Sequence, residues 1–171
     1  NQSNYENTIF QEAGSQSDFS TIIGLGDVNA DGISDFGIGY LYEYSGWIQR
    51  IMLFYGNETG VYSDSVVIAH ENIGRVRIYP VGDLNHDGAD DFVSHFSTDG
   101  SRLYWGNPAF NPANFLLITP TYNGDAAGEG FGHGDVNGDG APDIMGTSVT
   151  QANGYGDAYL WMGGTPMNGD T

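Results

Sequence analysis

A nine-residue acidic loop pattern, D-x-N-x-D-G-x-x-D, occurs three times and constrains the fold more than any other feature of the chain. It stands in GDVNADGISDF, GDLNHDGADDF and GDVNGDGAPDI. The first aspartates of the three loops are Asp27, Asp83 and Asp135, so the units recur after 56 and 52 residues. A period of this length indicates a repeat architecture, in which each repeat is one supersecondary unit. We number the loop positions 1 to 9 from the first aspartate.

The similarity between the units extends beyond the loops. Each loop lies between two short apolar segments, and an aromatic segment closed by glycine follows: RIMLFYG, SRLYWG and DAYLWMG. The first two units also have a fourth apolar piece, DSVVIAH and NFLLITPT. Short β-branched or aromatic runs bounded by Gly, Asn, Asp and Pro are typical of strands. We therefore predict an all-β chain of three four-stranded β-propeller blades, with a β-sandwich as the structural alternative.

The repeat boundaries leave one strand out of place. We expect a single β-propeller-type unit over residues 1–171, with repeats at approximately 15–74, 75–127 and 128–171. The last repeat lacks a fourth strand, whereas the head segment YENTIFQEAG resembles one. Residues 1–14 are predicted to pair with another copy of the chain or with a flanking segment of a longer polypeptide; an unstructured N-terminus is the alternative. Propellers typically have four to eight blades, so the three blades of one chain are too few to close a ring. Two copies would form a six-bladed ring, and open head-to-tail pairing would form a fibre.

The loop spacing favours a metal site made only of oxygen donors. In a tight loop the side chains at positions 1, 3 and 5 converge, the carbonyl at position 7 can point inward, and the aspartate at position 9 can close the cage. Glycine at position 6 (Gly32, Gly88, Gly140) permits the turn. Such a donor set favours Ca²⁺ over Mg²⁺ or Zn²⁺. One alternative is an EF-hand, which would need a carboxylate at position 12 and flanking helices. The other is a polar turn whose aspartates are merely solvated, and it would have to explain three identical placements.

These motifs resemble the FG-GAP repeats of integrin α-subunit propellers and of secreted bacterial proteins, over nearly the whole chain. The Phe-Gly pair that names the family is present as Phe131-Gly132. The Gly-Ala-Pro element that follows the loop in the family is replaced by GIG, VSH and MGT. The resemblance implies three Ca²⁺ sites, each with four side chains and the carbonyl at position 7. The implied ligands are Asp27, Asn29, Asp31, Ile33 and Asp35; Asp83, Asn85, Asp87, Ala89 and Asp91; and Asp135, Asn137, Asp139, Ala141 and Asp143.

Composition bounds the partners and the compartment. The 22 acidic and 4 basic residues give a net charge of −18, which disfavours nucleic acid and anionic membranes as partners. The chain has no cysteine, hence no disulfide or thiolate site, and no apolar run long enough for membrane insertion. Extracellular calcium modules bind at roughly 10⁻⁴ to 10⁻³ M. An affinity of this order would leave the sites mostly empty at cytosolic calcium levels, so we expect an extracellular, secreted or cell-surface protein. Sequons at Asn1 and Asn57 would permit glycosylation.

Catalysis has little support in the sequence. There is no G-x-S-x-G motif, no serine in a recognisable relation to histidine and aspartate, and the four histidines (His70, His86, His95, His133) lack metal-ligand spacing. We predict a non-enzymatic calcium-binding module for adhesion or supramolecular assembly, which forms a homo-oligomer or fibre through its N-terminal strand and has protein or glycan ligands at the cell surface.

Two other functions stay open. The first is a calcium-stabilised lectin that binds glycans through exposed tryptophans. The repeated position of Trp105 and Trp161 favours packing between blades, which leaves Trp47 as the better candidate for an exposed contact. The second is an accessory domain of a secreted hydrolase or lyase.

Overall fold

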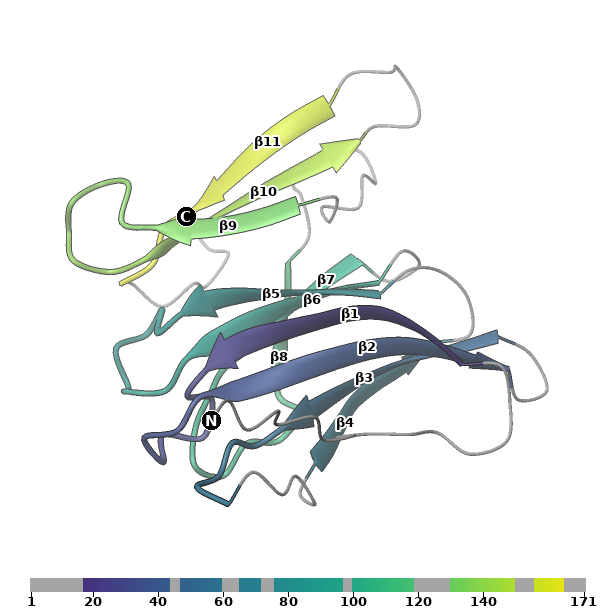
Figure 1. Cartoon of the computed structure of the whole chain (residues 1–171). Helices are drawn as coiled ribbons and strands as arrows, with labels where there is room; N and C mark the ends of the chain where they lie inside the picture. The colour runs from purple at the N-terminus through teal and green to yellow at the C-terminus, as the bar shows by residue number, and fades with distance from the viewer. Residues whose placement is uncertain are drawn as a thin grey trace, which may run out of the picture.

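The fold was analysed in a computed structural model that describes residues 17–43, 47–59, 65–71, 76–96, 100–118, 130–149 and 156–164 (Figure 1). Within these ranges the secondary structure consists of strands joined by turns and loops, so the all-β prediction is confirmed. The described part of the chain contains no helix that is long and apolar enough to cross a membrane.

The strands form three antiparallel sheets in which chain neighbours pair with each other. The first sheet has four strands, β1 (Ser17–Gly26), β2 (Asp35–Glu43), β3 (Trp47–Phe54) and β4 (Ser65–Glu71). The second also has four, β5 (Val76–Gly82), β6 (Asp91–Phe96), β7 (Gly100–Tyr104) and β8 (Phe115–Ile118). The third has three within the described residues, β9 (Gly130–Gly134), β10 (Asp143–Val149) and β11 (Gly156–Trp161).

The first two sheets repeat one aromatic cross-strand pair. Phe36 pairs with Phe54 across β2 and β3, and the two rings stack with centroids 5.2 Å apart. At the matching place in the second sheet, Phe92 pairs with Tyr104 at a centroid distance of 5.0 Å. Aromatic cross-strand pairs of this kind stabilise a sheet and fix its register. The repeated aromatic segments in the sequence therefore correspond to repeated structural positions.

Apolar side chains fill the space between successive sheets. Figure 1 shows β5 lying between β1 and β9, so the first strands of the three sheets are neighbours. One core cluster joins the first and second sheets and includes Leu25, Leu53 and Phe92. A second cluster joins the second and third sheets and includes Leu103 and Ile144. Each contact between sheets therefore has its own hydrophobic core.

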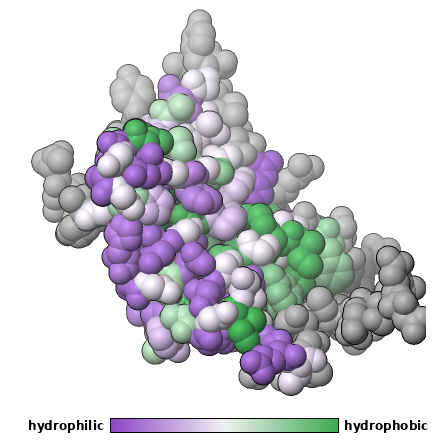
Figure 2. Space-filling model, turned by 60° about the vertical axis from the view of Figure 1, so that its left-hand side comes forward, coloured by the Kyte–Doolittle hydropathy of each residue, from purple (hydrophilic) through white to green (hydrophobic). Residues whose placement is uncertain are grey.

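The three sheets form no closed ring in the part of the chain that the structure describes. The predicted ring or fibre requires a second copy or a flanking segment, so it stays a prediction. β1–β4 lie within the predicted first repeat, β5–β8 within the second and β9–β11 within the third. The segment 1–14, predicted to exchange with another copy, lies outside the described residues. Much of the described surface is hydrophilic, with hydrophobic patches between the polar areas (Figure 2).

Close backbone packing requires a glycine at the end of the second aromatic segment, where Gly106 stands. A Cβ atom on Gly106 would collide with the carbonyl oxygens of Asp90 and Val28, which belong to two different acidic loops. A Cβ atom on Gly24, in contrast, would meet no atom within 4 Å. Backbone atoms cannot move aside as the end of a flexible side chain can, so a side chain at Gly106 would force the two loops to shift.

We expect Gly106→Ala to lower the free energy of unfolding by about 1–3 kcal/mol, the usual cost of overpacking. Gly24→Ala is the matched control, and it should change stability by no more than about 1 kcal/mol because a strand glycine in open space gains from a Cβ. Urea denaturation of both variants checks the prediction. Equal losses in the two variants would contradict it.

Candidate metal centres

Each acidic loop joins the first and second strands of its sheet, and all three loops adopt the same backbone turn. In the first loop, Ala30 at position 4 and Gly32 at position 6 have positive φ angles of 57° and 90°. The matching angles in the other loops are 58° and 92° at His86 and Gly88, and 79° and 94° at Gly138 and Gly140. Because glycine adopts such angles without strain, its presence at position 6 is explained.

Hydrogen bonds within each loop bring positions 1, 3 and 5 together. In the first loop, the Asp27 carboxylate accepts N–H groups from Asp31 and Gly32 at 2.9 and 2.7 Å. The Asn29 side chain accepts from the Asp31 N–H at 3.1 Å and donates to the Asp31 carboxylate at 2.9 Å. Asp31 also accepts the Ile33 N–H at 2.8 Å. The same five bonds recur at Asp83, Asn85, Asp87, Gly88 and Ala89, and at Asp135, Asn137, Asp139, Gly140 and Ala141.

The aspartate at position 9 has a structural role that the sequence did not reveal. Asp35 is buried, and its two carboxylate oxygens accept the N–H groups of Val28 and Gly56 at 2.9 and 2.8 Å. Asp91 accepts in the same way from Leu84 and Gly106, and Asp143 from Val136 and Gly163. This carboxylate therefore joins the start of each loop to the glycine that closes the aromatic segment. Each aromatic segment ends in a glycine, which lies 21, 15 and 20 residues after the position 9 aspartate of its unit, and this recurrence was the only signal in the sequence.

Burial makes two of the position 9 carboxylates, those of Asp35 and Asp91, electrostatically costly. Burial raises the pKa of Asp91 to about 7; the N–H groups of Gly106 and Leu84 oppose the shift, and the charges of Asp87 and Asp83 add to it. Burial also raises the pKa of Asp35. On the exposed Asp139, hydrogen bonds from Ala141 and Asn137 lower the pKa. A nearby cation would favour the charged forms of the buried pair.

The donor atoms fit a hard cation that takes several kinds of oxygen. Within the residues that the structure describes, no group of three or more carboxylate or imidazole side chains is arranged to hold a metal ion. An ion in a loop would therefore require the three aspartates of that loop to move closer together, and it would also need the asparagine amide oxygen and the backbone carbonyl at position 7. A carboxylate has about four acceptor sites, so one that accepts two N–H groups keeps lone pairs for an ion. Flexible coordination by such a mixed oxygen set suits Ca²⁺.

One histidine lies beside a serine, a contact that the sequence analysis did not predict. His95 Nδ1 lies 3.1 Å from the Ser101 hydroxyl, and the two residues are cross-strand partners on β6 and β7. Spacing along the chain did not reveal this pair because a hairpin brings the two together. Both side chains are buried, so a substrate has no direct access to them.

Two of the three tryptophans pack against the core. Trp105 and Trp161 are partly buried against the cluster that joins the second and third sheets, as their repeated position predicts. The Trp47 side chain lies outside the described part of the molecule. The described tryptophans therefore contribute to sheet packing and give no support to a glycan site.

Comparison with known proteins gives no further guide to function. No protein-family model matches the chain, and no curated protein matches it.

The raised pKa of Asp91 predicts a pH dependence of stability in metal-free buffer. An unfolded aspartate has a pKa of about 3.9. Between pH 4 and 7 the folded state therefore holds a proton that the unfolded state has lost, so stability falls as the pH rises through this range. We expect the free energy of unfolding to be about 2–3 kcal/mol lower at pH 7.5 than at pH 5. Urea denaturation with chelator at both pH values measures this difference.

Asp91→Asn is the matched variant, because it removes the titrating group and keeps the size of the side chain. The variant should lose most of the pH difference whatever its absolute stability. A pH difference unchanged from that of the parent chain would contradict the assignment to Asp91.

Proposed function

We propose that the chain is a non-enzymatic, extracellular calcium-binding module of β-propeller-type blades that serves adhesion or assembly. The observation that carries the proposal is the threefold repetition of one loop. Each copy has the same backbone angles, the same five internal hydrogen bonds and a buried aspartate at position 9. A solvated turn would not require the same acidic and amide side chains at the same places three times.

Calcium would have a structural role in this proposal. Each ion would be held by the aspartates at positions 1, 5 and 9, the asparagine at position 3 and the carbonyl at position 7. The ion would offset the repulsion between the loop carboxylates and the cost of burying Asp35, Asp91 and Asp143. It would thereby fix the connection between the first two strands of every sheet. We propose a weak affinity like that of extracellular calcium modules, which would leave the sites mostly empty at cytosolic calcium levels and would therefore require an extracellular location.

The blade interpretation is supported by the order and stacking of the sheets. Strands in each sheet follow chain order, which is the meander expected of a propeller blade. Adjacent first strands and a hydrophobic core between successive sheets are also expected of blades around a common axis. We propose that further blades, from another copy of the chain or a flanking segment, complete the ring or extend the stack.

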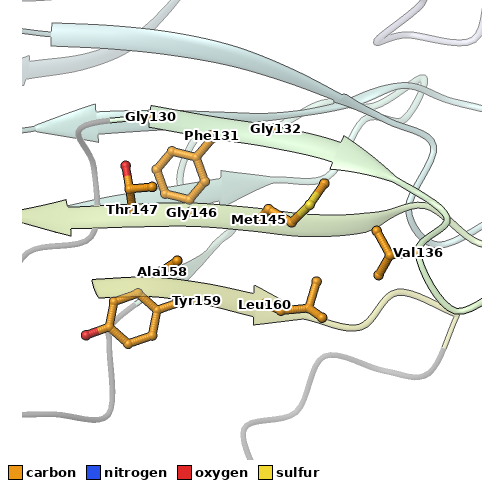
Figure 3. A pocket seen from close by; sticks show the side chains of 10 residues that line it. All are labelled: Gly130, Phe131, Gly132, Val136, Met145, Gly146, Thr147, Ala158, Tyr159 and Leu160. Carbon is orange, nitrogen blue, oxygen red and sulfur yellow. The ribbon is translucent and has the colours of Figure 1, made fainter. Parts of the chain in front are cut away.

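Assembly is supported by an uncovered face on the third sheet. Val136, Met145 and Leu160 are 51%, 37% and 47% exposed, and they line an open apolar hollow beside Tyr159 (Figure 3). The register pairs Met145 with Leu160 as it pairs Val93 with Leu103 in the second sheet.

The matching positions of the other two sheets are covered. Leu84, Val93 and Leu103 in the second sheet are nearly inaccessible to solvent because the third sheet covers them. In the first sheet, Val28 and Leu53 are covered by the second. The third sheet therefore presents the type of face that the other two sheets bury.

Among the described residues, the third sheet has no fourth strand at its β11 edge. β3 and β7 each pair with a fourth strand, whereas β11 pairs only with β10 among the described residues. An exposed strand edge is a ready template for another strand. We propose that residues 1–14 of a second copy add to this edge, and that the second copy also covers Met145 and Leu160.

Removal of calcium should destabilise the chain. At about 1 mM calcium and a dissociation constant of about 0.1 mM, one site contributes about 1.4 kcal/mol and three contribute about 4 kcal/mol. We expect the thermal unfolding midpoint to fall when excess chelator replaces 1 mM calcium, and magnesium to restore it only weakly. Differential scanning calorimetry measures the shift. An unfolding midpoint that is the same with calcium and with chelator would overturn the calcium proposal.

Self-association should depend on the third sheet and on the head segment. We expect Leu160→Glu, and separately deletion of residues 1–13, to reduce the molar mass measured by light scattering in 2 mM calcium. Leu117→Glu on β8 is the matched control, because Leu117 is also 47% exposed. It should leave the mass unchanged. A parent chain that is monomeric in 2 mM calcium, or a mass that none of these changes affects, would contradict the assembly proposal.

A further inference from the structure

We propose that Asp90 couples the first two acidic loops, so that they bind calcium as a cooperative pair while the third loop binds independently. This inference rests on the proposed function, since it concerns how the proposed calcium sites interact. Asp90 occupies position 8 of the second loop, between two proposed ligands of that loop, the Ala89 carbonyl and the Asp91 carboxylate. Asp90 is not itself a proposed ligand.

Two hydrogen bonds join Asp90 to the first proposed ligand of the first loop. The backbone N–H of Asp90 donates to the Asp27 carbonyl at 2.8 Å. The Asp27 backbone N–H donates to the Asp90 carboxylate at 2.8 Å. Both peptide groups that flank the Asp27 side chain are therefore held by one residue of the neighbouring loop. The packing is tight, because a Cβ atom on Gly26 would collide with the Asp90 carboxylate.

One peptide group connects the two proposed sites directly. The N–H that binds the Asp27 carbonyl belongs to the same peptide unit as the Ala89 carbonyl, a proposed ligand of the second ion. A cation at that carbonyl polarises the peptide and strengthens its N–H as a donor, because hydrogen-bonded dipoles in a chain reinforce one another. An ion in the second loop would therefore orient Asp27 for the first loop. By linkage, an ion in the first loop would favour binding in the second to the same degree.

The third loop cannot take part in this arrangement. Its position 8 is Pro142, which has neither a backbone N–H nor a carboxylate. The equivalent bond to Asp83 therefore cannot form, although the proposed ligands of the third loop have the same residue types as those of the others. The residue at position 8, which the ligand pattern leaves free to vary, therefore decides which loops share this pair of hydrogen bonds.

The test follows each loop separately in the full chain labelled with ¹⁵N-glycine. The N–H groups of Gly32, Gly88 and Gly140 each donate to the position 1 aspartate of their own loop, at 2.7, 2.9 and 2.9 Å, so each reports its own ion. During a calcium titration we expect Gly32 and Gly88 to shift together with a Hill coefficient above 1. Gly140 should shift along a separate curve with a coefficient of 1.

Asp90→Pro copies the third loop, where proline also follows alanine, and it removes both the N–H and the carboxylate that bind Asp27. It should separate the Gly32 and Gly88 curves and raise the midpoint at Gly32 by about fivefold or more. Asp90→Asn keeps an acceptor and the N–H, so it should retain the coupling. Ser34→Pro is the matched control at position 8 of the first loop, and it should leave Gly32 and Gly88 titrating together.

The possible failures are distinguishable. If the unchanged chain takes up calcium at three independent sites, or if Asp90→Pro leaves Gly32 and Gly88 titrating together, the coupling is overturned and the calcium proposal stands. If the unchanged chain takes up no calcium, both are overturned.

Discussion

The structure depends on one buried carboxylate in each sheet. Asp35, Asp91 and Asp143 each accept an N–H from the start of an acidic loop and another from a closing glycine. These hydrogen bonds hold together the loop, the second strand and the end of the third strand. The same burial penalises the negative charge, as the pKa of about 7 at Asp91 indicates. At Asp91, the group that organises the fold is therefore also a group whose negative charge is costly to bury.

The two end faces of the stack of sheets differ in how far their apolar side chains are exposed. Each internal contact buries an apolar face of one sheet against the next. The face of the first sheet that points away from the second sheet is also buried, at Ile38, Tyr40, Met52 and Phe54. Its counterpart on the third sheet exposes Met145 and Leu160. This asymmetry favours growth of the stack at the third sheet, and so it agrees with the proposed role in assembly.

The loops are alike in their proposed ligands and different in their neighbours. Position 8 is serine in the first loop, aspartate in the second and proline in the third. Only the aspartate brings both a carboxylate and an N–H to the adjacent loop. Small changes outside a repeated motif can in this way give equivalent sites different behaviour.

The sequence by itself determined the strands, the loops and their period. These are local features, since short apolar runs predict strands and glycine at position 6 permits a left-handed turn. It also determined the oxygen-rich chemistry of the loops, because that depends on residue type and spacing.

Only the tertiary structure decided how the units meet. It decided that Asp90 binds Asp27 across 63 residues, that His95 lies beside Ser101, and that the face containing Leu160 is uncovered. It also gave the position 9 aspartates their second role, as links to the closing glycines. The physical reason is that such contacts depend on how sheets stack and strands pair, and residues far apart in the chain meet only when that packing forms.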